Sequence, residues 1–352
     1  MTNRRQFVKK AGGLAVAASL PSFSFNIMNR PRLDEDIIGH GDFRYRLERN
    51  WSKLKPNNSP VVNCHEMVMD KRKRLIMVTD HPKNNVLITD TSGNLLDSWT
   101  LNFKSAHGLT IVDEGGEEML FITDPNTGTV VKTTLDGKIV LTLNPKKEGF
   151  YGDCQSFGPT ETAIAANGDI YVADGYGSQF ITQYDSQGKG IRKFGGDSFL
   201  QKNKFKQVHG VAIDARDKEN PTLLCSARIK NAFKRFSLEG EFIEDIYLPG
   251  AFVSRPVIDD DMLYSGVCFG MQPNKPIITQ NLGFVTIIDT NNKVVSNPGG
   301  KAPMYVDGEL QTMYQDKPIF KHCHDVCLDD DKNLYVLQWN AKGVYPYKLH
   351  RI

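Results

Sequence analysis

An all-β six-bladed propeller, with four-stranded antiparallel blades around a central channel, is the fold that two features of this 352-residue sequence predict. Short stretches of alternating apolar and polar residues recur in units of roughly 40–50 residues, which is the period of propeller blades. Asp-Gly, Ser-Gly, Asn-Gly or Glu-Gly pairs interrupt each unit, as expected for hairpin turns between strands. Residues 43–352 are therefore expected to form a single domain.

The first 25 residues carry the pattern of a twin-arginine export signal. Arg4 and Arg5 are followed by Phe7 and Lys9 and then by a weakly apolar stretch that ends at Leu20, which is the R-R-x-F-x-K arrangement. We therefore expect the twin-arginine export machinery as a partner and the bacterial periplasm as the destination. Residues 26–42 are expected to be a linker.

Charge and hydropathy exclude two classes of partner. The net charge is +2, and the four basic residues among the first ten exceed it, so the rest of the chain is slightly acidic. This balance gives no electrostatic reason to expect nucleic acid. No apolar run approaches the roughly 20 residues that a membrane span needs, so no stable membrane span is expected.

Six copies of the repeat follow one another along the chain. They begin, in order, at Cys64, His107, Pro159, His209, about Pro256 and His324. The last copy ends soon after its third strand, so residues 43–51, FRYRLERNW, are expected to supply its outer strand and close the ring. Residues 297–320 are expected to be an insertion before the last blade.

Three histidines occupy the same position in alternate copies, at the start of the first strand: His107, His209 and His324. First strands line a propeller's channel, and alternate blades of six lie about 120° apart, so the three imidazoles should converge on the axis. Neutral imidazole is the commonest ligand of zinc, and three histidines with an open position are typical of a catalytic site. We therefore predict a zinc site, or a site for another divalent transition metal.

Two further candidates follow the second strands of blades 3 and 4. Tyr176 could act as a base if neighbouring positive charge lowers the pKa of its phenol. Arg228 could bind a substrate carboxylate through two hydrogen bonds. His65 and His322 lie near the same channel rim in the repeat and are candidates for a supporting role.

These residues resemble the peptidyl-α-hydroxyglycine α-amidating lyases among the NHL-repeat propellers. The resemblance covers most of residues 60–350 and is strongest at HGLTI, at DIYVADGYG, at HGVAI and at HDVCLD. It implies a zinc held by His107, His209 and His324, with Tyr176 as base and Arg228 in the channel. It also implies a structural calcium bound by the backbone carbonyls of Met67 and Leu109 and by Asp325, which we add to the catalytic candidates.

The sequence departs from that family at three positions. Asp80 stands where the family has an active-site arginine, His322 replaces a methionine, and Gly177 replaces a half-cystine. Asp80 reverses the charge at the substrate end, and so puts a peptide substrate in question more than it does the metal site.

Three functions remain open from the sequence. The first is a metal-dependent lyase that breaks a carbon–heteroatom bond in a carboxylate-bearing small molecule or peptide. The second is a lyase or dehydratase that performs β-elimination on oligosaccharides or polysaccharides containing uronic acids, where Asp80 would contact sugar hydroxyls. The third is a non-catalytic propeller that binds partners on one face.

Overall fold

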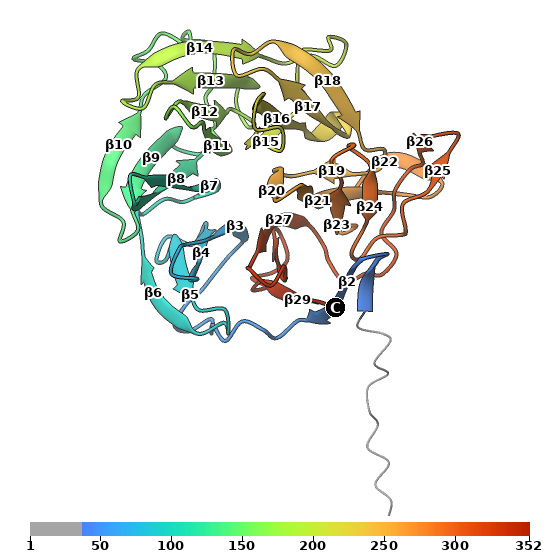
Figure 1. Cartoon of the computed structure of the whole chain (residues 1–352). Coiled ribbons are helices and arrows are strands. Elements are labelled where there is room, and N and C mark those ends of the chain that lie inside the picture. The colour runs from blue at the N-terminus through green and yellow to red at the C-terminus, as the bar shows by residue number, and fades with distance from the viewer. Residues whose placement is uncertain (1–36) are drawn as a thin grey trace, which may run out of the picture. The chain divides into compact units, whose positions relative to one another are not determined.

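The computed structural model describes residues 37–352 and forms a ring of six antiparallel sheets (Figure 1). In this view one strand of each sheet lies nearest the centre and the sheet extends from it to the perimeter. The predicted all-β, six-bladed propeller is thus confirmed. Helical structure within residues 37–352 is limited to the short turn η2 (Arg228–Lys230), and none of it is long and apolar enough to span a membrane.

Blades 1 to 4 each contain four strands in chain order. Blade 1 comprises β3 (Cys64–Met69), β4 (Leu75–Thr79), β5 (Val86–Thr89) and β6 (Leu95–Trp99). Blade 2 comprises β7 (Leu109–Glu114), β8 (Glu117–Asp124), β9 (Thr129–Thr134) and β10 (Ile139–Leu143). Blade 3 comprises β11 (Glu161–Ile164), β12 (Ile170–Ala173), β13 (Phe180–Tyr184) and β14 (Gly190–Gly195). Blade 4 comprises β15 (Val208–Asp214), β16 (Thr222–Ala227), β17 (Ala232–Phe236) and β18 (Phe242–Tyr247).

Blades 5 and 6 are larger. Blade 5 comprises β19 (Phe252–Val253), β20 (Val257–Asp259), β21 (Met262–Gln272), β22 (Lys275–Thr279), β23 (Phe284–Ile288) and β24 (Val294–Ser296). Blade 6 comprises β27 (Cys323–Leu328), β28 (Leu334–Gln338), β29 (Tyr347–Arg351), β2 (Phe43–Glu48) and β1 (Ile37–His40).

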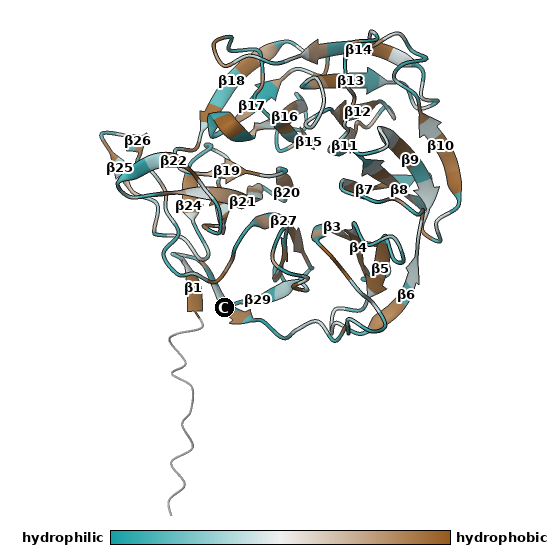
Figure 2. Ribbon diagram, turned by 180° about the vertical axis from the view of Figure 1, so that it is seen from behind, coloured by the Kyte–Doolittle hydropathy of each residue, from teal (hydrophilic) through white to brown (hydrophobic). Residues whose placement is uncertain are grey.

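The hydrophobic core lies between the blades. Strand β4, LIMVT, is buried at all five positions, because a neighbouring blade covers each of its faces, whereas four of the five residues of β6 at the perimeter are exposed. Figure 2 shows hydrophobic colour on inner strands such as β4 and also on parts of perimeter strands such as β6, and hydrophilic colour on many connecting turns. Trp51 and Tyr335 pack edge to face at 4.8 Å between blades 6 and 1. Full burial of one such large apolar side chain contributes about 1.5–3 kcal/mol.

The hairpin turns form at the pairs of a polar residue and glycine, such as Asp-Gly, in the sequence. Gly137, in Leu-Asp-Gly-Lys, has a φ of 88°, and its N–H donates to the carbonyl of Thr134 at 3.0 Å. This positive φ favours glycine, because a Cβ atom is strained there. The hairpin between β9 and β10 therefore reverses where the sequence places glycine.

The N-terminal segment joins the last blade. Strand β2 pairs with β29, with Leu47 opposite Leu349, and Leu47 is buried. Residues 26–42 were expected to be a linker throughout, but Ile37–His40 forms β1 and pairs with β2, which corrects that boundary. β1 is held there because the apolar side chain of Ile38 packs into the hydrophobic core between blades 5 and 6. The expected export signal, residues 1–25, and the rest of the linker lie outside the described residues.

The insertion at 297–320 packs at the edge of the ring. It contains a short hairpin of β25 (Tyr305–Val306) and β26 (Glu309–Leu310), which Figure 1 places at the perimeter beside β22. The Tyr305 hydroxyl accepts a hydrogen bond from the N–H of Val294 at 2.7 Å. Met313 is buried in the core between blades 4 and 5. The insertion therefore reinforces blade 5.

Candidate functional site

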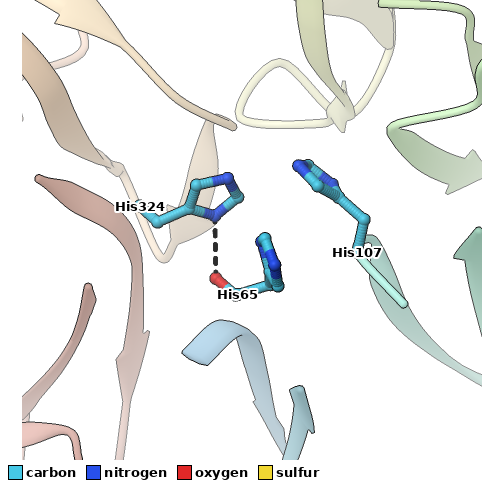
Figure 3. A group of neighbouring side chains, drawn as sticks. All are labelled: His65, His107 and His324. Carbon is cyan, nitrogen blue, oxygen red and sulfur yellow. Dashed lines mark hydrogen bonds between the residues drawn. The ribbon is translucent and has the colours of Figure 1, made fainter. Parts of the chain in front are cut away.

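Four buried histidines converge in the channel, one each from blades 1, 2, 4 and 6: His65, His107, His209 and His324. The ring centroids of His107, His209 and His324 lie 4.7–4.9 Å apart, so the structure brings the predicted trio together. The ring of His65 lies 4.7 Å from that of His107 and 4.8 Å from that of His324. Figure 3 shows His65, His107 and His324 directed toward one another.

Irregular first strands aim three of these side chains, those of His65, His209 and His324, inward. The pairing register shifts between Cys64 and Glu66 in blade 1, between Val208 and Val211 in blade 4, and between Cys323 and Asp325 in blade 6. Each shift contains one of the histidines, and such bulges re-aim a side chain out of the regular alternation. Gly210 follows His209 because a Cβ atom there would lie 2.3 Å from the Cα of Arg255.

The channel histidines are uncharged imidazoles, and each of His107 and His324 has one unprotonated ring nitrogen. The Nδ1 atoms of His107 and His324 donate to the carbonyls of Thr160 and His65, both at 2.9 Å, which leaves each Nε2 with a lone pair. Burial lowers the pKa of His107, His209 and His324 well below the usual value, and the other histidines and Arg228 lower it further. Neutral imidazole is the form that binds metals.

The residues present fit a divalent transition metal. One ligand atom from each of His65, His107 and His324 lies within 4.8 Å of the others. The predicted ligand His209 is not in this group, although its ring lies 4.7 Å from that of His107. Buried nitrogen atoms of His65 (Nδ1), His209 (Nδ1) and His324 (Nε2) have no hydrogen-bond partner. Leaving such groups unsatisfied costs about 1–3 kcal/mol each, a cost that a bound cation would remove.

Tyr176, just after β12, reaches this cluster through its hydroxyl. Its Oη lies 3.0 Å from Nε2 of His209 and 3.3 Å from Nε2 of His107, although 47% of the residue is exposed. Burial of the hydroxyl raises the pKa of Tyr176 to about 12, against the opposing effect of Arg228. Burial therefore outweighs Arg228 in the metal-free protein, and a lowered pKa would require the additional positive charge of a bound metal.

Arg228 is fixed beside Tyr176. It begins the turn η2 after β16 and is 2% exposed. Its Nε donates to the carbonyl of Val253 at 3.1 Å and its Nη2 to the Ser254 hydroxyl at 2.9 Å. Both partners belong to blade 5, so the guanidinium joins blades 4 and 5 without a bound ligand.

The rim residues have separate roles. Asp80 accepts hydrogen bonds from the N–H and side-chain amide of Asn63 at 2.8 and 2.6 Å and lies 3.5 Å from Nε2 of His65. Burial opposes its ionisation, but these contacts lower the pKa of Asp80. His322 is outside the cluster: its ring contacts the carbonyl of Trp339 and the N–H of Asn281, both at 3.1 Å. Asp80 thus supports His65, whereas His322 does not contact the predicted metal ligands through these bonds.

The expected calcium ligands hold an arginine instead. Arg255 donates from Nη2 to the carbonyl of Met67 at 2.9 Å and from Nη1 to that of Leu109 at 2.8 Å. Its Nε and Nη2 bind the two oxygens of Asp325 at 2.7 and 3.0 Å. These residues do not fit a calcium ion, because a guanidinium already occupies all three.

Asp325 is consequently a structural residue. Its Oδ2 also accepts the N–H of Met67 at 2.9 Å, so both of its oxygens face Arg255 and the backbone. Burial raises the pKa of Asp325 to about 6, while Arg255 opposes the rise. These contacts account for Asp325 without a catalytic role, and its place among the catalytic residues stays a prediction.

His65 is the member of the cluster that the sequence analysis placed only in a supporting role. Its signal was present: Cys64-His65-Glu66 in blade 1 parallels Cys323-His324-Asp325 in blade 6. Arg255 has no comparable signal, because it lies between the short strands β19 and β20 of the irregular fifth blade.

Comparisons with known proteins agree with the sequence resemblance. No family model matches the chain. The chain is 37% identical over 196 residues to a probable peptidyl-α-hydroxyglycine α-amidating lyase of Caenorhabditis elegans, covering 53% of this chain and 52% of that protein. It is 27% identical over 182 residues to NHL repeat-containing protein 3 of Homo sapiens, covering 49% of this chain and 51% of that one. The chain thus spans about half the length of these curated relatives, and the predicted resemblance is confirmed as sequence similarity.

Solved structures support the fold. A streptogramin B lyase superposes with a TM-score of 0.55 at 14% identity, covering 87% of this chain and 97% of that one. A gluconolactonase from Xanthomonas campestris gives a TM-score of 0.56 at 14% identity, covering 88% and 90%. At this identity the likeness concerns the propeller architecture alone.

Proposed function

We propose that this protein is a metal-dependent lyase that breaks a carbon–heteroatom bond next to a carboxylate, as the amidating lyases that it resembles do. The observation that carries the proposal is the Tyr176 hydroxyl, held 3.0 and 3.3 Å from two buried imidazoles beside Arg228. Similarity to relatives named as amidating lyases supports the same class of reaction. A divalent metal bound by His107, His209 and His324 would supply Lewis acidity toward a substrate oxygen.

Tyr176 is the proposed base. Its phenol is protonated at neutral pH in the polypeptide alone, since its pKa is about 12. Positive charge within about 4–6 Å lowers such a pKa by 1–3 units, so Arg228 and a cation in the channel both favour the phenolate. With an α-hydroxyglycine substrate, Tyr176 takes the hydroxyl proton, the O–H electrons form the carbonyl of glyoxylate, and the C–N electrons leave with the amide nitrogen. That nitrogen then accepts a proton.

Arg228 and the neighbouring cavity are proposed to hold the substrate. The buried guanidinium offers a forked donor that suits a carboxylate. Tyr176 also lines a cavity of about 670 Å³ with Gln179, Lys206 and Ile229, whereas neither Arg228 nor the channel histidines are among its lining residues. We propose that a carboxylate-bearing small molecule or peptide reaches the histidines past Tyr176, which borders both this cavity and the cluster. Asp80 is engaged by Asn63 and His65, so the contact to sugar hydroxyls that favoured a uronate substrate has no support here.

Glyoxylate release tests this function. Metal-loaded protein should release glyoxylate from an α-hydroxyglycine amide, and Tyr176→Phe should lower kcat at least a hundredfold, since general bases contribute about 10²–10⁴. Tyr247→Phe, on the exposed edge of β18, is the matched control and should keep full activity. Absence of release from metal-loaded wild type would contradict the peptide reaction, and loss of water from uronate oligosaccharides would favour the second hypothesis.

The proposed location is the periplasm, reached by the twin-arginine route. The proposal rests on Arg4, Arg5, Phe7 and Lys9 in the sequence. A fusion of residues 1–42 to a reporter should appear in the periplasm, and replacing both arginines with lysine should retain it in the cytoplasm. Export that persists in the double-lysine variant would contradict this route.

A further inference from the structure

Blade 1 adds an imidazole to the channel that the three-histidine pattern does not include. His65 is 3% exposed and its Nδ1 has no hydrogen-bond partner. The ligand atoms of His65, His107 and His324 lie within 4.8 Å of one another. The backbone carbonyl of His65 also accepts the Nδ1 proton of His324 at 2.9 Å (Figure 3), so the two histidines are positioned together.

A carboxylate fixes the orientation of the His65 ring. Asp80 is held by two hydrogen bonds from Asn63 and lies 3.5 Å from Nε2 of His65. A carboxylate at this nitrogen favours the tautomer with the proton on Nε2, which leaves the Nδ1 lone pair free. Metal-binding histidines generally contact a carboxylate or carbonyl through their second nitrogen in this way.

We infer that His65 is a fourth imidazole ligand of the channel metal and that Asp80 is its positioning residue, an inference that rests on the metal site of the proposed function. In a six-bladed ring blades 1 and 4 are opposite, so His65 and His209 approach the axis from opposite sides, with His107 and His324 between them. Asp80 therefore stabilises the metal site from the position at which the resembling family has an arginine.

Four imidazoles constrain the metal that can be used. Zinc in proteins is usually four-coordinate, and four histidine ligands would leave no position for a substrate oxygen. A metal that accepts five or six ligands, such as Fe²⁺, Mn²⁺ or Co²⁺, keeps that position open. The inference thus favours these metals over the zinc expected from three histidines.

Cobalt binding tests the inference without recourse to activity. Co²⁺ is added to protein from which metal has been removed with a chelator. The dissociation constant of the cobalt complex is measured by competition with a chelator, and the visible spectrum of the bound cobalt reports the number of ligands. His65→Ala should weaken binding at least a hundredfold and change the spectrum. Asp80→Asn should weaken binding about 10–100-fold. The control His350→Ala, on β29 where its ring contacts Glu48, should change neither.

The outcomes separate this inference from the proposed function. Tight cobalt binding by wild type, with the same affinity and spectrum in His65→Ala, overturns the fourth ligand and leaves the three-histidine site. Weaker binding with an unchanged spectrum overturns it as well, because loss of a ligand must alter the cobalt bands. Absence of specific cobalt binding by wild type overturns both. The folded state of each stripped variant is checked by thermal unfolding, and Asp80→Asn preserves side-chain shape if His65→Ala does not fold.

Discussion

Replacing Arg255 with methionine keeps much of the side-chain volume and removes the cation that joins four blades. The guanidinium comes from blade 5 and binds Met67 of blade 1, Leu109 of blade 2 and Asp325 of blade 6. Glu66 and Glu161 lie 3.4 and 3.8 Å from it and are also buried. The substitution therefore leaves three buried carboxyl groups without their counter-charge.

The expected loss follows from that arrangement. Removing one partner of a buried ion pair costs about 3–5 kcal/mol of the free energy of unfolding. The pKa of Asp325 is already raised by burial to about 6 with Arg255 present, and that of Glu66 is raised well above its usual value, first by burial and then by Glu161. Without the arginine both pKa values rise further, so the folded variant holds protons that the unfolded chain releases above about pH 4.

The sign of the pH effect is therefore fixed. Because the folded state binds more protons, stability falls as pH rises from the unfolded pKa to the folded pKa, by about 1.4 kcal/mol per pH unit for each carboxyl group. The destabilisation caused by Arg255→Met should be largest at pH 7.5 and should shrink by up to about 2 kcal/mol at pH 5.5 for Asp325, because the wild-type carboxyl also binds its proton below about pH 6. Urea unfolding of wild type and variant at both pH values measures it.

A smaller residue at the same position should create a cation requirement. Arg255→Ala vacates two carbonyls and a carboxylate, which are oxygen ligands of the kind calcium prefers. Millimolar Ca²⁺ should raise the Tm of Arg255→Ala and leave wild type and the control Arg235→Ala unchanged, since Arg235 pairs with Asp214 and Glu244 within blade 4. A wild-type Tm that falls when calcium is chelated, or an Arg255→Met protein as stable as wild type at pH 7.5, would refute this reasoning.

Three other predictions concern substrate binding by Arg228, closure of the ring through β2, and the protonation of His209. Arg228→Lys should raise KM more than it lowers kcat and reduce kcat/KM about 10–100-fold in steady-state assays, since lysine lacks the forked donor; an unchanged KM would remove Arg228 from substrate binding. Leu47→Ala should lower the free energy of unfolding by about 2–4 kcal/mol, whereas the exposed neighbour Arg46→Ala should change it by less than about 0.5 kcal/mol; equal effects would argue against closure through β2. In metal-stripped protein the pKa of His209 is lowered, so the unfolded chain binds a proton there more readily than the folded protein does. The wild type should therefore lose stability relative to His209→Gln as pH falls below about 6.5, by up to about 1.4 kcal/mol per pH unit. Parallel curves of unfolding free energy against pH for the two proteins would contradict this.

The fold was predictable because its signals are local. Turn pairs such as Asp136-Gly137 recur at blade period, and each apolar strand lies within a few residues of its turn. The histidines His107, His209 and His324 were predictable for the same reason, since they repeat at one position of the unit.

The remaining parts of the site depend on contacts between distant residues. Arg255 bonds to partners 70 to 188 residues away, and nothing in its neighbourhood in the sequence marks it. The pairing of Asp80 with His65 and the high pKa of Tyr176 depend on burial and side-chain direction. The Asp80–His65 contact forms within blade 1, whereas the contacts of Arg255 and the burial of Tyr176 arise only when the blades close into a ring.

The central claim, that a metal in the channel histidines is needed for bond cleavage, is tested most directly by titrating metal into stripped protein and following glyoxylate release. We predict that activity is absent in the stripped protein, rises linearly with added metal and reaches a plateau at one equivalent per chain, and that His209→Ala shows no rise. Full activity in stripped protein, held in excess chelator, would contradict the account.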